Sequence, residues 1–99
     1  AVQIGEEGKT TGYVAEGPYL YEKDGNISLL WSTYTKTGYS VFESVSKNGV
    51  RGDYVAKRKI FEKDGGHCMR FTDLQGKSHI VLHQPNFAPM ERMKIIDEP

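Results

Sequence analysis

Residues 19–32, YLYEKDGNISLLWS, decide the fold class of this chain, because two runs of strand-forming residues flank a tight turn. Aromatic and aliphatic side chains dominate both runs, and Asp24-Gly25-Asn26 lies between them. An Asp-Gly pair between two such runs is a strong short-range signal for a β-hairpin. The stretch therefore predicts two antiparallel strands.

The chain continues in the same way on the C-terminal side of this hairpin. Residues 39–45 alternate apolar and polar side chains, as a half-exposed strand does. Residues 54–61 favour a charged strand at a sheet edge, with a short helix as the alternative. Further strands are expected at residues 68–72 and 78–83, which form a second hairpin around Gln75-Gly76, and at residues 92–97. The fold class is therefore all-β, with antiparallel sheets.

Composition excludes several classes of protein. Ninety-nine residues suffice for one domain at most. The formal net charge is zero, which gives no electrostatic reason to expect nucleic acid or a membrane surface as partner. No apolar run approaches membrane-spanning length. The single cysteine, Cys68, excludes an internal disulfide and a cysteine-built zinc site.

An internal repeat emerges when the sequence is shifted by about 51 residues. Gly25 then falls on Gly76, and the apolar residues 29–31 fall on residues 80–82. A period near 50 built from short strands is typical of β-propeller blades, while two β-meanders of one sandwich remain the alternative. The predicted organisation is a loop or tail over residues 1–12, one blade over 13–64, and a second, partial blade over 65–99.

The same shift places Glu16 on His67, each at the start of its unit's first strand. In a propeller such strand starts crowd around the central axis. Two titratable side chains at equivalent positions therefore indicate a site rather than a core.

Six segments in order resemble glycoside hydrolase family 43. They are Ala15-Glu16-Gly17-Pro18-Tyr19-Leu20-Tyr21, Leu30-Trp31-Ser32, Gly38-Tyr39-Ser40-Val41, Gly65-Gly66-His67-Cys68-Met69, Leu82-His83-Gln84-Pro85-Asn86 and Glu91-Arg92. The resemblance covers residues 13–98. It implies a five-bladed β-propeller that hydrolyses arabinose- or xylose-containing glycans with inversion. It also implies three carboxylates: a base, a tuning aspartate and an acid glutamate.

Carried over residue by residue, the resemblance makes Glu16 the general acid, since it stands in the family's Glu-Gly-Pro context. It makes His67 the histidine near the axis that is associated with a calcium ion, here through water. No other cofactor is expected. Without the resemblance, Glu16 reads as a surface carboxylate and His67 as a structural histidine. No aspartate precedes Glu16. The chain is therefore expected to be a C-terminal fragment that is inactive alone.

Other candidate residues have two readings each. Tyr39 and Arg92 are candidate substrate-binding residues. The alternative for Tyr39 is a position in the core, and the alternative for Arg92 is a surface salt bridge. Trp31 favours packing over sugar stacking, and Cys68 favours a small buried thiol over a nucleophile. His79 and His83 fit a three-histidine zinc site with His67 poorly, and His83 is expected to line the rim or brace a loop.

The expected partner is an arabino- or xylo-oligosaccharide, with self-association through uncovered blade faces. The alternative function is a non-catalytic carbohydrate-binding or self-associating β-domain. An extracellular or periplasmic location is implied only by the resemblance, since residues 1–11 show no signal-peptide pattern. The compartment therefore stays open.

Overall fold

A computed structural model of the chain describes residues 2–4 and 12–99. These residues contain strands and no helix, which confirms the all-β prediction. The strands are β1 (Val2–Ile4), β2 (Gly12–Val14), β3 (Glu16–Lys23), β4 (Asn26–Thr35), β5 (Gly38–Ser46), β6 (Val55–Phe61), β7 (Gly66–Thr72), β8 (Ser78–Gln84) and β9 (Arg92–Asp97). In the described part of the chain, no helix is therefore long and apolar enough to cross a membrane.

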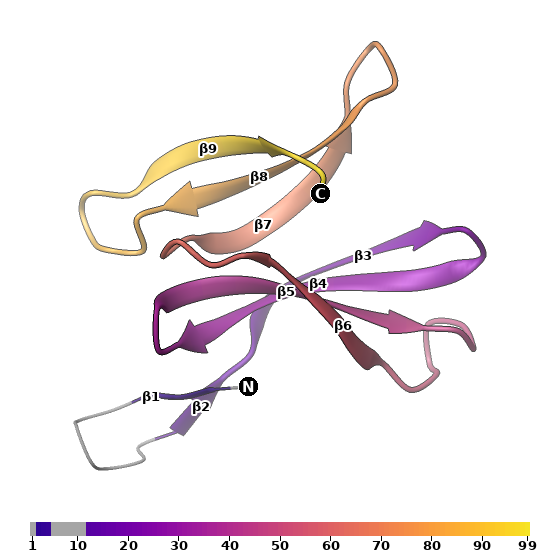
Figure 1. The fold of residues 1–99 in the computed structure, drawn as a ribbon, viewed down its shortest axis with the longest axis horizontal. Helices are drawn as coiled ribbons and strands as arrows, with labels where there is room; N and C mark the ends of the chain where they lie inside the picture. The colour runs from indigo at the N-terminus through magenta and orange to yellow at the C-terminus, as the bar shows by residue number, and fades with distance from the viewer. Residues whose placement is uncertain (1, 5–11) are drawn as a thin grey trace.

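The strands form three antiparallel sheets (Figure 1). The large sheet has the order β3-β4-β5-β6, the second sheet has the order β7-β8-β9, and β1 pairs with β2. The charged strand β6 is an edge strand, as its sequence predicts. The expected loop over residues 1–12 differs from the structure at residues 2–4 and 12, which form strands. Residues 1 and 5–11 lie outside the described part.

The hairpin of residues 19–32 forms as its sequence predicts. Lys23 pairs with Asn26, which leaves Asp24 and Gly25 as a two-residue turn. Both turn residues have positive φ, 53° and 81°. This conformation matches the twist of the flanking strands and favours Asp-Gly.

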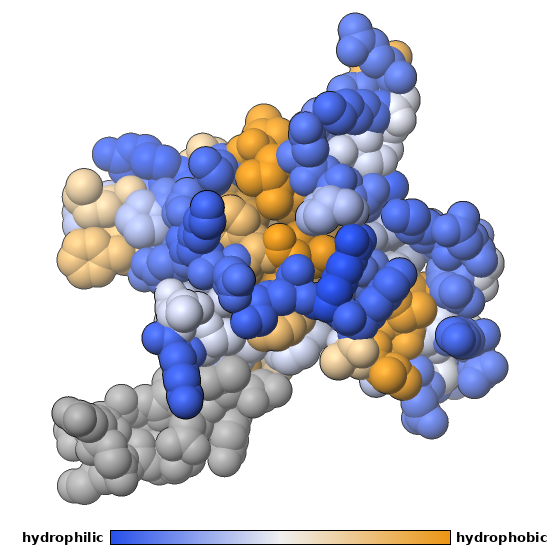
Figure 2. Space-filling view, viewed as in Figure 1, coloured by the Kyte–Doolittle hydropathy of each residue, from blue (hydrophilic) through white to orange (hydrophobic). Residues whose placement is uncertain are grey.

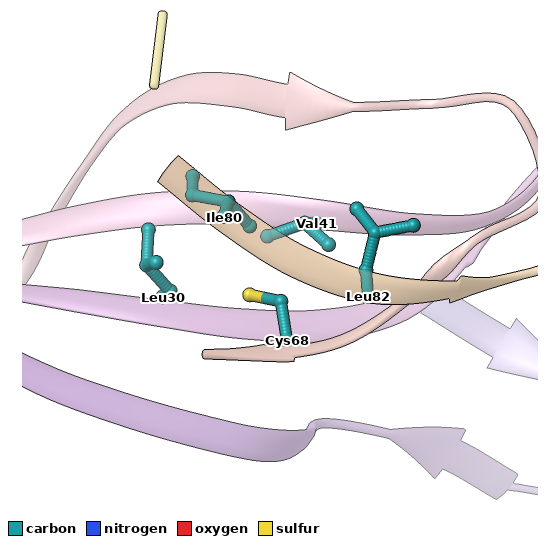
Figure 3. Packing of buried hydrophobic residues seen from close by; sticks show 5 residues of the cluster. All are labelled: Leu30, Val41, Cys68, Ile80 and Leu82. Atoms are coloured by element: carbon teal, nitrogen blue, oxygen red, sulfur yellow. The ribbon is translucent and has the colours of Figure 1, made fainter. Parts of the chain in front are cut away.

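The core lies between the two larger sheets, where β7 packs across β3, β4 and β5. Figure 3 shows five buried side chains pointing toward one another from β4, β5, β7 and β8: Leu30, Val41, Cys68, Ile80 and Leu82. Each large aliphatic side chain buried in this way contributes about 1.5–3 kcal/mol. The prediction that Cys68 is a small buried thiol is confirmed, and burial raises the pKa of this thiol to about 11.

The two sheets are related as consecutive blades of a propeller. Under an offset of 51, Leu29 and Leu30 correspond to Ile80 and Val81. Leu30 and Ile80 are both fully buried between the sheets, while Leu29 and Val81 are only partly buried. Equivalent residues therefore point in opposite directions relative to the interface. Rotation about a shared axis produces this pattern, whereas a symmetric sandwich would bury the same positions from both sheets.

Each of the two larger sheets leaves uncovered the face that points away from the other one. Met69, Met93 and Ile95 are 49%, 73% and 61% exposed on the second sheet. On the large sheet, Trp31 stacks on Phe42 with ring centroids 5.3 Å apart. Figure 2 shows an apolar area over the second sheet, bordered by hydrophilic side chains. Exposed apolar faces of this kind mark surfaces that another element covers.

Polar residues also link the sheets. The carboxylate of Glu43, 2% exposed, accepts a hydrogen bond of 2.7 Å from the Arg58 guanidinium. The Tyr21 hydroxyl donates to Glu43 and to Glu98, at 3.2 and 3.3 Å. Glu98 also accepts a 2.5 Å bond from Arg70, whose guanidinium lies 4.4 Å from the centre of the Tyr21 ring. Buried charges are tolerated because each has a partner.

These pairs make stability depend on pH. Burial opposes ionisation of Glu43, but the hydrogen bonds from Arg58 and Ser28 and the nearby positive charges together outweigh it and hold the pKa of this carboxyl below its usual range. The hydrogen bond from Arg70 does the same to the pKa of Glu98. Burial, followed by the charges of Glu43 and Glu98, raises the pKa of Tyr21 to about 12.

The free energy of unfolding should therefore fall as the pH drops below about 5. Both carboxyls have a lower pKa when folded than the unfolded value of about 4.3. Their contribution is thus present above the unfolded value and is lost as pH falls through the folded one. Urea titrations between pH 7 and pH 3 measure this loss.

Arg58→Met should cost about 3 kcal/mol at pH 7, because it leaves a buried carboxylate without its partner. It should also flatten the acid limb of the profile. Lys59→Met is the matched control, since it removes a cation from the exposed pair with Glu62. Equal pH profiles for the two variants would contradict this account.

Candidate active site

The candidate site lies where β3 and β7 begin, and each of these strands carries a bulge there. The pairing of β3 with β4 shifts between Glu16 and Tyr19, and the pairing of β7 with β8 shifts between Gly66 and Met69. Bulges of this kind bend a strand and re-aim its side chains. Both blades thus begin with the same irregularity in strand pairing.

The bulges correct one sequence prediction. Gly17 and His67 have the same left-handed conformation, with φ of 61° and 53°. They are therefore equivalent, and the counterpart of Glu16 is Gly66 rather than His67. Equivalent residues of the two sheets differ by 50 in number between β3 and β7, and by 51 between β4 and β8. The β7–β8 turn takes up the difference, since the bond from Asp73 N to Lys77 O encloses three residues instead of two.

Glu16 and His67 nevertheless come together. The distance from His67 Nδ1 to Glu16 Oε2 is 3.9 Å, and the two side chains are 61% and 49% exposed. The His67 backbone N–H donates a 2.8 Å bond to the Ser32 hydroxyl, which fixes β7 against β4. A Cβ on Gly17 would lie 3.0 Å from the Cα of His67. Glycine therefore allows the two bulges to touch.

Tyr39 is the second partner of Glu16. Its hydroxyl donates a 2.5 Å hydrogen bond to Glu16 Oε2. Tyr39 was expected to bind substrate, whereas its side chain is only 1% exposed and is closed to a sugar ring. Burial, followed by the hydrogen bond to Glu16, raises the pKa of Tyr39. The phenol therefore stays protonated and acts as a donor.

The Tyr39 ring is enclosed from several sides. It stacks on His83 with centroids 5.7 Å apart and packs against Tyr34 at 5.0 Å. A Cβ on Gly66 would lie 2.7 Å from ring atom Cε2. The backbone N–H of Tyr39 donates a 3.1 Å bond to the Asp64 carboxylate. Both blades thus define where the hydroxyl points.

The loop after β8 closes this cluster. The side-chain oxygen of Asn86 lies 2.8 Å from His83 Nε2, and its Nδ2 donates a 2.7 Å bond to the Tyr34 hydroxyl. The Asn86 backbone N–H donates to the Asp64 carbonyl at 2.9 Å. Of the two roles expected for His83, these bonds support bracing of the loop. Sequence reasoning gave no role to Ser32, although it stands in the quoted Leu30-Trp31-Ser32 segment, and it missed Asp64, which stands in none of the quoted segments.

Arg92 lies outside this cluster. Its guanidinium donates to the carbonyl oxygens of Glu91 and Pro89, at 2.8 and 3.5 Å. His79 is also separate, with Nε2 2.7 Å from Asp73 Oδ2. The half-buried Trp31 donates a 3.1 Å bond from Nε1 to the Ser44 hydroxyl.

Within the described residues, no three of the histidine, cysteine, aspartate and glutamate side chains converge as metal ligands. Calcium takes about six to eight oxygen ligands. Glu16 and His67 alone do not fit such a site. The expected calcium contact of His67 through water therefore stays a prediction, and it requires ligands from outside this cluster.

The cluster has the geometry for proton transfer. Glu16 is half-exposed, and only its Oε2 is engaged by the described residues. A carboxyl with one oxygen anchored and the other open can give a proton to a bound oxygen atom, provided that it is protonated. The alternative role for the Glu16 carboxyl is to bind a sugar hydroxyl without transferring a proton.

Comparison with solved structures gives three relevant matches. The endo-arabinase from Bacteroides thetaiotaomicron superposes with a TM-score of 0.86 at 35% sequence identity, over 99% of this chain and 36% of that protein. A thermostable family-43 glycoside hydrolase superposes with a TM-score of 0.64 at 18% identity, over 84% of this chain and 31% of that protein.

The third match, the α-L-arabinanase of Cellvibrio cellulosa in complex with arabinohexaose, has a TM-score of 0.57 at 21% identity. It covers 84% of this chain and 33% of that protein. The two matches below 25% identity support the fold alone. No protein-family model matches the chain, and neither does any curated protein. The fold shared with all three and the 35% identity to the endo-arabinase show that the chain belongs to glycoside hydrolase family 43, spanning about a third of the length of the proteins that it matches.

Proposed function

We propose that this chain supplies the general acid, Glu16, of an inverting glycosidase that acts on arabinose- or xylose-containing glycans. The observation that carries the proposal is the half-exposed Glu16 carboxyl, held at one oxygen by the buried Tyr39 hydroxyl. The 35% identity to an endo-arabinase supports arabinose-containing glycans as substrates. The binding of arabinohexaose by the more distant arabinanase agrees with an oligosaccharide substrate.

An inverting glycosidase needs two carboxyl groups across the scissile bond. One protonates the leaving oxygen, and the other activates a water molecule on the opposite face of the sugar. In the described cluster the second carboxylate is Asp64, which already accepts bonds from the backbone N–H groups of Tyr39 and Asn86. The base and the tuning aspartate therefore come from a further part of the protein, and this chain alone is inactive.

The proposal can be tested by exchanging the matching third of the Bacteroides thetaiotaomicron endo-arabinase for this chain. The chimera should hydrolyse arabinan, and the isolated chain should not. Glu16→Gln should lower kcat of the chimera about 100- to 10,000-fold, because general acid catalysis contributes that much. An aryl arabinoside with an activated leaving group should lose far less, since its departure needs little protonation.

Glu62→Gln is the matched control, because Glu62 is an exposed carboxylate that directly follows β6 and pairs with Lys59 of that strand. It should leave kcat unchanged. Arabinan hydrolysis by the chimera that survives Glu16→Gln would exclude Glu16 as the acid. Binding of arabino-oligosaccharides to the chain without turnover by the chimera would favour a carbohydrate-binding domain.

We also propose that the isolated chain self-associates through its uncovered faces. The large sheet carries a hollow of about 310 Å³, lined at its β3 edge by Ala15, Glu16 and Pro18 and on its outer face by Leu29, Trp31 and Ser44. The outer face of the second sheet offers exposed Met93 and Ile95. In this chain the opposite faces of the same two sheets already pack together, so a second copy can repeat that packing.

Light scattering should therefore show the mean mass of the isolated chain rising with concentration. Ile95→Lys should reduce this association at least about tenfold, because it places a charge in an apolar contact. Val50→Lys alters an exposed apolar residue outside the strands and is the control. A monomer at all concentrations would contradict the proposal.

A further inference from the structure

We infer that Tyr39 is a positioning residue for Glu16: its hydroxyl fixes one carboxyl oxygen and leaves the other as the oxygen that carries the transferred proton. This inference rests on the proposed acid role of Glu16. It assigns to Tyr39 a role different from the substrate contact expected from the sequence.

The contact geometry supports a fixed orientation. Tyr39 pairs with Tyr34 across β4 and β5, and Glu16 pairs with Ser32 further along β4. The two side chains therefore reach the same side of the large sheet, where a 2.5 Å bond joins them. Hydrogen bonds of this length are typical of a hydroxyl that donates to an ionised carboxylate.

The surroundings of Tyr39 make the hydroxyl rigid. The ring is 1% exposed and lies between His83 and Tyr34. On the side of β7 the ring lies against Gly66, where an added Cβ would come within 2.7 Å of it. A freely rotating surface tyrosine would not determine which carboxyl oxygen faces the substrate, whereas this enclosed one does. Rigid supporting residues of this kind are what hold a reacting group in its productive geometry.

The proton balance shows why the bond assists transfer. The O–H bond of the Glu16 carboxyl breaks, a new O–H bond forms on the leaving oxygen, and the glycosidic C–O bond releases its electron pair to that oxygen. The negative charge appears on the Glu16 carboxylate. The Tyr39 hydroxyl donates to this carboxylate, so the bond strengthens as the transition state is reached.

Two charged or titratable groups of the described residues face the Glu16 carboxylate. They are Tyr39 from β5 and His67 from β7, at 2.5 and 3.9 Å from Oε2. His67 is largely exposed, so its position is less restricted than that of Tyr39. The buried phenol is therefore the group that fixes the orientation.

The first test uses the endo-arabinase chimera. Tyr39→Phe should lower kcat on arabino-oligosaccharides about 10- to 100-fold, as a misplaced catalytic group does. KM should change little, because the buried phenol does not touch substrate. The loss should be smaller on an activated aryl arabinoside. Tyr19→Phe is the matched control, since its hydroxyl donates to the Arg70 carbonyl across the same two sheets, away from Glu16.

The second test uses the isolated chain instead of the chimera and does not depend on activity. The buried Tyr39 hydroxyl proton should give a downfield NMR signal that moves upfield in Glu16→Gln, while the Tyr19 signal stays in place. Absence of any effect of Glu16→Gln on the Tyr39 signal would overturn the inference.

The two proposals fail separately. Activity of the chimera that survives Glu16→Gln would refute the acid role. Loss of activity in Glu16→Gln, combined with equal kcat for Tyr39→Phe and Tyr19→Phe, would refute the positioning role alone. If Tyr39→Phe lowers the thermal stability of the chimera more than Tyr19→Phe does, the NMR result decides.

Discussion

The close approach of the two sheets at the start of β3 and β7 is the constraint on which the rest of the structure depends. Neither Gly17 nor Gly66 could carry a side chain without meeting His67 or the Tyr39 ring. This contact aligns the core residues of both sheets and encloses Tyr39. The packing of the second blade on the first therefore also builds the candidate site.

Three kinds of interaction cross this interface, and they reinforce one another. Apolar side chains fill its centre, the Tyr21 hydroxyl of the large sheet bonds Glu98 and its ring lies under the Arg70 guanidinium of the second sheet, and the Glu16 cluster lies at the strand starts. Apolar packing supplies most of the stability but has little direction. The hydrogen-bonded pairs require defined geometry, so they fix how the blades are rotated against each other.

Local patterns in the sequence predicted most of the strands, both hairpins and the edge position of β6, because turn residues and alternation act over a few residues. The family motif also drew attention to Glu16, which lies in the cluster with Tyr39 and His67. The role of Tyr39 could not be predicted, since it depends on a contact with a residue 23 positions away and on space left by Gly66. The equivalence of Glu16 with His67 failed by one residue, because the longer β7–β8 turn changes the offset between the blades.

The unfolding free energy of Gly66→Ala, measured by urea titration, tests the central role of this interface most directly. The new Cβ would lie 2.7 Å from the Tyr39 ring and 2.9 Å from the Ser32 hydroxyl, so overpacking should cost about 1–3 kcal/mol, and the Tyr39 ring resonances should shift. Gly76→Ala, which meets nothing within 4 Å but has a φ of 83°, carries a backbone cost that Gly66→Ala lacks, and it should leave those resonances in place. A Gly66→Ala chain that keeps the wild-type stability and the wild-type Tyr39 spectrum would contradict this account.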